Sequence, residues 1–365
     1  MNDLAQALGG RNKSGPYADD HPGPILEAVH LRKMFPLHSW NLLGAKQAVH
    51  AVEDASLALY PGRATALVGE SGSGKTTVAR IMAGLYTPTS GSMRFRGEPA
   101  KLTDASHLRT YRRHVQLILQ DPFSSLNPVH DVRYHLARPL HIYSHVHSKA
   151  QEIEHILSLL NRVNLSPAEQ FIQKYPHQLS GGQRQRVAIA RALAVQPEVL
   201  LADEPVSMLD VSIRLDILNL LLRLKEEERL ALLFITHDIA SARYFAEDTL
   251  VMYAGQMVEG GPSDEVIQQP MHPYTQLLVS AASDPARVGH NQDTVRGNGD
   301  HPGGLADKDV VISRGEIPSL IHPPSGCRFH PRCPHAMPVC SQRFPARTEL
   351  GNGRWTHCFL YGDAE

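Results

Sequence analysis

The chain lacks a charge excess of either sign and lacks any long hydrophobic run. Its 365 residues carry 36 Lys and Arg against 37 Asp and Glu, a formal net charge of -1. Without a basic excess we expect no nucleic-acid partner. Without about 18 consecutive apolar residues we expect no membrane-spanning helix. Residues 1–24 have no apolar signal-peptide centre, so we expect a disordered leader and a chain that stays in the cytoplasm.

Cysteine is absent until late in the sequence, where Cys327, Cys333, Cys340 and Cys358 follow one another. In a cytosolic chain, four clustered thiols favour a metal site over disulfides. The gaps between them are wider than the short pairs usual for structural zinc. By ligand count, four thiolates suit Zn²⁺ and a [4Fe–4S] cluster equally. Free thiols are the remaining alternative.

A glycine-rich stretch between an apolar run, 64–68, and a helical run, 77–85, is the strongest motif. It fits the phosphate-loop pattern of Gly, four residues, then Gly-Lys-Ser/Thr. Backbone N–H groups and a helix N-terminus there form a cradle for anions. Lys75 would reach the outer phosphates and Thr76 would ligate Mg²⁺. A glycine-rich turn is the weaker alternative. The expected nucleotide contacts are Gly69, Ser71, Gly72, Ser73, Gly74, Lys75, Thr76 and Thr77.

Strand and helix patterns alternate along the chain, which indicates a mainly parallel sheet with ligands at the carboxyl ends of its strands. Helical periodicity over 132–174 indicates an inserted helical subdomain, which we place at about 122–180. Residues 274–311 are expected to form a connecting helix and a flexible linker. Residues 312–365 are expected to form a separate small unit that contains the cysteines.

Polar side chains follow three of the apolar strands. Asp203 and Glu204 come after 199–202; Asp203 would hold Mg²⁺ and Glu204 would polarise a water. Gln120 could touch the metal or the water. His237 would contact the γ-phosphate if the strands are neighbours. Taken singly, the carboxylates could be a strand-end turn and the histidine could be structural.

A second glycine-rich helix start, Ser180-Gly181-Gly182-Gln183, precedes the helix expected at 184–194. Ser180 is a plausible N-cap, and consecutive glycines at a helix start make a second potential phosphate site. Asp210 stands before another amphipathic segment and could be no more than its N-cap.

Together these motifs resemble those of the ATP-binding subunits of ABC transporters. The resemblance covers roughly 25–273 and implies an α/β P-loop NTPase fold, the ABC nucleotide-binding domain. This fold would have an inserted helical subdomain, an antiparallel N-terminal β-subdomain and a small Cys-containing C-terminal extension. The matching segments are Gly69–Thr76 (Walker A), Gln120 (Q-loop), Leu179–Gln183 (signature loop), Val199–Asp203 with Glu204 (Walker B), Ser207–Asp210 (D-loop) and His237 (switch histidine).

The resemblance implies ATP hydrolysis with Mg²⁺ in a head-to-tail sandwich of two such domains. Each ATP would lie between one subunit's Walker A and the other's signature loop. The signature residues, Ser180 and Gly182 foremost, would therefore contact the partner's nucleotide. Phe35 occupies the place where this family has an adenine-stacking aromatic; as an alternative, it is a core residue.

Three further segments, 120–128, 175–178 and 272–275, resemble the dipeptide, oligopeptide and nickel importer group. This resemblance implies two membrane permeases and either a sister ATP-binding subunit or a second copy of the chain. It also implies an extracytoplasmic solute-binding protein, engaged indirectly, and a peripheral place on the cytoplasmic face of the inner membrane. We expect exposed Phe123 and Leu126 to contact a permease; an ordinary turn with packed apolar residues is the alternative.

The cysteine segment also resembles the tail of peptide-importer ATPases, some of which bind [4Fe–4S], so we favour iron–sulfur over zinc. Two other functions compete with the importer. One is a soluble ABC ATPase of DNA repair or translation, which would usually need long coiled-coil insertions or a second cassette. The other is a metal-sensing regulatory ATPase, which would predict a degraded Glu204.

Overall fold

The computed structural model describes residues 23–37, 47–143, 146, 148–283 and 317–362. Nearly all of the expected leader, 1–24, and the linker residues from 284 to 311 lie outside these described parts. Within them, no helix combines the length and apolar character needed to cross a membrane.

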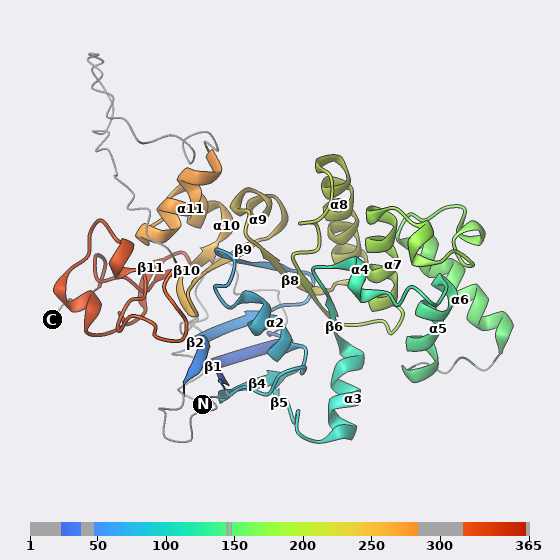
Figure 1. The fold of residues 1–365 in the computed structure, drawn as a ribbon, viewed down its shortest axis with the longest axis horizontal. Helices are drawn as coiled ribbons and strands as arrows, with labels where there is room; N and C mark the ends of the chain where they lie inside the picture. Colours follow the sequence, from blue (N-terminus) through green and yellow to red (C-terminus); the bar gives the residue numbers. More distant parts are fainter. Residues whose placement is uncertain (1–22, 38–46, 144–145, 147, 284–316, 363–365) are drawn as a thin grey trace, which may run out of the picture.

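One mixed sheet organises the described chain (Figure 1). Its strand order is β5-β4-β1-β2-β10-β9-β3-β8-β7-β6, and β12 and β11 add to β10 at one side. The strands are β1 (Leu26–Pro36), β2 (Ala48–Leu59), β3 (Ala64–Val68), β4 (Ser90–Phe95), β5 (Glu98–Pro99), β6 (Val115–Ile118), β7 (Val199–Asp203), β8 (Ala231–Thr236), β9 (Asp248–Tyr253), β10 (Gln256–Pro262), β11 (Thr348–Gly351) and β12 (Arg354–Thr356).

The helices flank this sheet and also form a group at one end of the molecule (Figure 1). They are α2 (Lys75–Met82), α3 (Ala105–His114), α4 (Pro122–Ser125), α5 (Val132–Tyr143), α6 (Lys149–Arg162), α7 (Gly181–Leu193), α8 (Val211–Glu228), α9 (Ile239–Phe245), α10 (Ser263–Gln268) and α11 (Pro273–Ser283). Short 3-10 turns supplement them, among them η3 (His330–Arg332) and η4 (Pro338–Ser341) in the extension.

The parallel part of the sheet fixes the place of the site. β3 lies between β8 and β9 and is parallel to both, and β7 and β6 continue the parallel order. Every residue of β3, β7 and β8 is buried, which explains why these strands read as continuous apolar runs. Val68 pairs with Thr236, and Asp203 pairs with Ile235. The loops after these strands therefore start side by side at one edge.

The N-terminal strands form the expected antiparallel subdomain. β1 pairs antiparallel with β2 and with β4, and β4 pairs with β5 in the same sense. A single parallel contact between Gln256 and Asp54 joins β10 to β2. This subdomain places Phe35 and Ala51 beside the first turn of α2, where the loop after β3 ends.

The helical subdomain packs α4, α5 and α6 on α7, and its apolar side chains join a core that also contains residues of β3, β7 and β8. Leu126, directly after α4, is only 1% exposed within this core. The prediction that Leu126 is exposed to a permease is therefore wrong. The reason is the packing of α4 on α7, where Arg191 Nη1 donates a 2.6 Å hydrogen bond to the Ser125 carbonyl.

The C-terminal extension is joined to the main sheet and does not form a separate unit as expected. β12 pairs antiparallel with β10, with Glu259 opposite Thr356 and Gly260 opposite Trp355. A third apolar cluster, which includes Tyr253, Tyr274 and Phe329, links β9, α11 and the extension. Through this pairing and packing, the extension lies beside β9 and β10 of the main sheet.

Candidate functional site

The glycine-rich loop after β3 is shaped by close backbone approaches. Gly74 is the N-cap of α2, with a φ of 104° that L side chains rarely adopt. A Cβ built on Gly74 would lie 2.3 Å from the Ala51 carbonyl oxygen, and one on Gly69 would lie 2.1 Å from that of Met252. At both positions only glycine lets the loop close over the end of the sheet.

Lys75 is buried at the first turn of α2 and folds back over its own loop. Its Nζ donates hydrogen bonds of 2.7 Å to the Gly69 carbonyl, 2.8 Å to the Glu70 carbonyl and 3.3 Å to Ser73 Oγ. Burial lowers the pKa of Lys75, and nearby Glu204, Asp203 and Glu70 oppose that shift. The ammonium group therefore lies over the loop, at the place where the sequence predicts the outer phosphates.

A hydroxyl and a carboxylate meet beside the lysine. Thr76 Oγ1 donates a 3.0 Å hydrogen bond to Asp203 Oδ1, which lies at the end of β7. Asp203 is 1% exposed, and burial raises its pKa despite the bond from Thr76. Two oxygen donors at this spacing, one of them a buried carboxylate, fit the ligand preference of Mg²⁺.

Glu204 brings the three strand-end side chains together. Gln120 Nε2 donates a 2.8 Å hydrogen bond to Glu204 Oε2, and His237 Nδ1 lies 3.4 Å from the same oxygen. The backbone of Glu204 has a φ of 45°, a strained value for a residue with a side chain. With this backbone conformation, the Glu204 carboxylate lies within reach of both Gln120 and His237.

Lys75, Glu204 and His237 line a cavity of about 710 Å³, and residues of the N-terminal subdomain line its other side. Phe35 lines it, and its ring packs edge-on against Tyr86 at a centroid distance of 5.4 Å. Sequence reasoning missed the apolar lining residues that belong to no motif, namely Val49, Ala51, Leu278 and Leu320. The cavity is lined by Phe35, Val49, Ala51, Glu70, Ser71, Gly72, Gly74, Lys75, Thr76, Thr77, Gln120, Glu204, His237, Leu278 and Leu320.

The second glycine-rich helix start lies elsewhere. Ser180 Oγ accepts the Gln183 N–H at 3.3 Å, and Gln183 Oε1 accepts the Ser180 N–H at 3.1 Å, so the two form a capping box on α7. Ser180 is exposed, and none of residues 180–183 lines the cavity. Figure 1 places α7 with α5 and α6, apart from α2. Asp210 is the N-cap of α8, with no side-chain cap bond, and is also outside the cavity.

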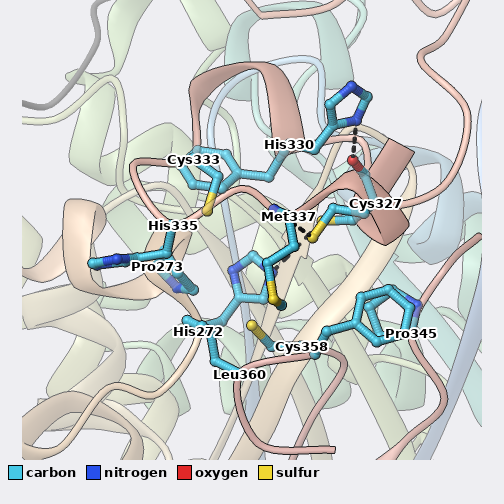
Figure 2. Close-up of a pocket in the computed structure, with 13 residues that line it drawn as sticks. His272, Pro273, Cys327, His330, Cys333, His335, Met337, Pro345, Cys358 and Leu360 are labelled. Atoms are coloured by element: carbon cyan, nitrogen blue, oxygen red, sulfur yellow. Dashed lines mark hydrogen bonds between the residues drawn. The ribbon is translucent and has the colours of Figure 1, made fainter. Parts of the chain in front are cut away.

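The four cysteines line one small pocket of about 20 Å³ in the extension (Figure 2). All four are free thiols. Burial raises the pKa of Cys327 to about 12 and that of Cys358 to about 11. Across the described ranges, however, no three His, Cys, Asp or Glu side chains are grouped as metal ligands. The thiols therefore share a pocket without forming a ready ligand set.

Comparison with known families accounts for most of the chain. Residues 52–207 match the ABC transporter family. Residues 258–308 and 301–340 match the family described as the C-terminal region of oligopeptide/dipeptide transporters. The first match includes Lys75, Gln120 and Glu204, and the second includes Cys327, Cys333 and Cys340.

Curated proteins with similar sequences carry transport names. The chain is 38% identical over 338 residues to the oligopeptide transport ATP-binding protein AppF of Bacillus subtilis, covering 92% of this chain and 97% of AppF. It is 42% identical over 321 residues to the di/tripeptide transport ATP-binding protein DppF of Pseudomonas aeruginosa, covering 88% of this chain and 93% of DppF.

A solved structure supports the same assignment. The post-hydrolysis dimer of the ATP-binding cassette MJ0796 with ADP and phosphate superposes with a TM-score of 0.58 at 30% identity, covering 65% of this chain and 98% of that one. ATP and Mg²⁺ are the ligands expected of such a cassette. The chain therefore belongs to the ABC transporter family, among the oligopeptide and dipeptide transport ATP-binding proteins, and is an ABC-type ATPase subunit.

Proposed function

We propose that this ATPase energises an importer for peptides or related solutes. The observation that carries the hydrolytic part is Glu204, held between Gln120 and His237 at the edge where Lys75 and Thr76 lie. The transport part is supported by the match of 258–308 and 301–340 to the oligopeptide/dipeptide transporter C-terminal region. Intact Glu204 and the peptide-transport names of the relatives disfavour the repair, translation and metal-sensing alternatives.

In the proposed mechanism the loop backbone and Lys75 bind the ATP phosphates, and Phe35 stacks on the adenine. Thr76, Asp203 and Gln120 would hold Mg²⁺, which neutralises charge on the phosphates when bound. Glu204 accepts a hydrogen bond from the attacking water and orients it in line with the γ-phosphate. His237 contacts the γ-phosphate on the other side of Glu204. Positioning and charge neutralisation supply most of the rate acceleration.

Replacing Glu204 with Gln tests this arrangement. The amide keeps the shape but loses the charge that polarises water, so ATP turnover should fall by about 10²-fold or more while ATP remains bound. Phosphate release and nucleotide binding are measured on the same purified chain. Wild-type turnover in this variant would refute the role of Glu204.

We propose that two ATP-binding subunits form a head-to-tail sandwich. Exposed Ser180, with Gly181, Gly182 and Gln183, would face the nucleotide of the partner, and Asp210 would approach the same interface. The exposure of this helix start and its absence from the chain's own cavity support the proposal. The partner is a second copy or a sister ATP-binding subunit. Crosslinks between Ser180→Cys and the partner's Ser71→Cys that form only with bound nucleotide would support it, and their absence would count against it.

We further propose that the subunit works at the cytoplasmic face of the inner membrane with two permeases, and indirectly with an extracytoplasmic solute-binding protein. Residues 120–128 supply the permease contact, without buried Leu126. In domain terms, 25–273 is the ATP-binding domain with 122–180 as its helical part, 274–311 is the connection and 312–365 is the extension. Co-purification with two membrane permeases from solubilised membranes tests the assignment; isolation without them contradicts it.

We propose, last, that Cys327, Cys333, Cys340 and Cys358 hold a [4Fe–4S] cluster, with Zn²⁺ as the alternative. Their four free thiols on one pocket support this, although the side chains must rotate to form a ligand set. The thiols would bind as thiolates, and the cluster would tie the segments of the extension together. Iron, zinc and visible absorption are measured on anaerobically purified protein. A sample without any of the three refutes a metal site.

A further inference from the structure

The cysteine-containing extension makes a direct ion pair with the phosphate loop. Arg332, at the end of η3, places Nη1 3.0 Å from Glu70 Oε2 and Nη2 3.3 Å from Glu70 Oε1. Both arms of the guanidinium are engaged, the geometry of the strongest arginine–carboxylate pairs. The Arg332 side chain is 11% exposed and that of Glu70 is 25% exposed. This pair is therefore better shielded from water than a typical surface ion pair.

The surroundings of Arg332 hold it in place. Its Nη1 also donates a 3.2 Å hydrogen bond to Tyr253 Oη, and its guanidinium lies 5.7 Å from the Tyr253 ring centre and 5.8 Å from that of Phe329. Tyr253 ends β9 and Phe329 belongs to the extension. The arginine thus links the extension, the main sheet and the phosphate loop.

The backbone of Glu70 is fixed from the same side. The Glu70 N–H donates a 2.8 Å hydrogen bond to Tyr274 Oη, and Tyr274 is fully buried at the start of α11. The Tyr274 ring packs 4.5 Å from that of Tyr253 and 5.5 Å from that of Phe329. Both the main chain and the carboxylate of Glu70 are therefore held through one aromatic cluster that the extension completes.

The negative charge of Glu70 would affect the binding of ATP if Arg332 did not compensate it. Glu70 lies within the loop that cradles the phosphates and lines the same cavity. An unpaired carboxylate there would repel a polyphosphate, and the repulsion is strong because the site is partly shielded from water. Arg332 supplies the compensating positive charge. The extension also contributes Leu320 to the cavity, and the Leu320 carbonyl accepts the His50 N–H at 2.8 Å.

We propose that Arg332 is a positioning residue of the ATP site: it compensates the charge of Glu70 and fixes this residue of the phosphate loop, so the cysteine-containing extension and nucleotide binding are coupled. The proposal rests on the nucleotide site described above. Because such coupling is reciprocal, ATP must also stabilise the segment around Arg332.

The first test measures Mg-ATP affinity on the full-length chain by fluorescence titration. Arg332→Gln leaves Glu70 unpaired, and affinity should fall about tenfold, the loss typical of a charge-assisted bond. Raising the salt should shrink this loss, because salt screens the remaining repulsion. The double variant Arg332→Gln with Glu70→Gln should recover most of the affinity. Unchanged affinity in the single variant, or a loss that the double variant does not recover, overturns the proposal.

Control variants distinguish a loss of the Arg332–Glu70 pair from a general disturbance of the extension or of the nucleotide site. Arg347→Gln removes another arginine of the extension, one that pairs with Glu349 and covers the Trp355 ring at 4.5 Å, and it should leave ATP affinity unchanged. If Arg332→Gln fails to fold, Arg332→Lys keeps the charge but loses the two-armed geometry and should show a smaller loss. Lys75→Ala tests the site itself: wild-type affinity in that variant refutes the nucleotide site, whereas wild-type affinity in Arg332→Gln refutes only the coupling.

The second test asks whether bound ATP stabilises the segment around Arg332. In hydrogen exchange of the whole chain, Mg-ATP should slow exchange over 326–336 in the wild type. The protection should be lost or much reduced in Arg332→Gln measured at saturating ATP. Equal protection in both proteins, or none in the wild type, contradicts the proposal.

Discussion

Two glycine-rich helix starts in this chain look alike in sequence and differ in how the fold surrounds them. The loop of 69–76 follows a buried central strand, and its glycines meet backbone oxygens of β2 and β9. The start of α7 follows a short 3-10 turn at 176–178, and its exposed Ser180 closes a capping box with its own Gln183. The first is enclosed by the chain; the second is turned outward.

The two helix starts therefore differ in which groups the chain places around them. Around 69–76 the chain supplies a lysine, a hydroxyl, the buried carboxylate of Asp203 and the carboxylate of Glu204, which accepts a hydrogen bond from Gln120. Residues 180–183, in contrast, line no part of the cavity that holds these groups. In the proposed head-to-tail pair, this second helix start would bind the nucleotide of another subunit. The following predictions test this contrast, from the largest effect to the smallest.

Replacing a glycine with alanine should impair ATP binding at the loop of 69–76 but not at the start of α7. Gly74→Ala places Cβ against the Ala51 carbonyl at a positive φ, so ATP affinity should fall by about 100-fold or more. Gly181→Ala meets only a Leu209 methyl at 3.4 Å and should leave ATP binding to the single chain unchanged. Isothermal titration on both variants measures this.

Gly72→Ala is the control for backbone strain alone. Gly72 has a φ of 78°, but a Cβ added there would meet no atom within 4 Å, so its loss of ATP affinity should be smaller than that of Gly74→Ala. Equal losses in the two variants would show that the close approach to Ala51 is unimportant.

Mixing two inactive variants should restore activity if the sandwich contains two copies of this chain. In a head-to-tail pair, Glu204→Gln in one subunit and Ser180→Arg in the other place both defects in one site and leave the second site intact. ATPase activity should rise from near zero to about a quarter of the wild type, since about half of the pairs are mixed and each has one whole site. Activity is measured after the two variants are mixed and equilibrated. No recovery would indicate that the partner is a different subunit.

His237→Ala should lower the rate of ATP turnover at the site of 69–76 without lowering the affinity for ATP. Its ring lies 3.4 Å from the carboxylate of Glu204 and lines the cavity. Turnover should fall by about 10²-fold because the γ-phosphate loses a contact during reaction, while ATP affinity stays within about twofold. Phosphate release and equilibrium binding are compared. A matching loss of affinity would mean that His237 mainly binds the ground state.

Ser180→Ala should have the smallest effect on the isolated chain. It removes the hydroxyl that accepts the Gln183 N–H, and α7 should lose about 1 kcal/mol of stability. Thermal unfolding measures the loss, and Ser180→Thr should retain most of the cap. ATP binding to the single chain should not change in either variant; a change would place this helix start in the chain's own site.

The sequence predicted that several polar side chains would meet at one edge of the sheet, because each of them follows a strand. Gln120, Asp203 and His237 each follow an apolar run, and parallel strands place their carboxyl ends at one edge. The exposure of Leu126 was predicted wrongly because a short apolar turn carries no signal of what packs on it. The prediction that the extension forms a separate unit was also wrong. The strand β12 has only three residues, too few for an alternating pattern that would predict its pairing with β10.

By itself the sequence determined the local devices of this protein: the phosphate loop, the serine cap of α7 and the carboxylates after β7. Each depends on hydrogen bonds and torsion angles within a few residues, so a short pattern specifies it. Only the tertiary structure decided that Arg332 reaches Glu70 and that Leu320 joins the nucleotide cavity. Contacts between residues more than two hundred positions apart depend on how whole layers pack, and no spacing along the chain encodes them.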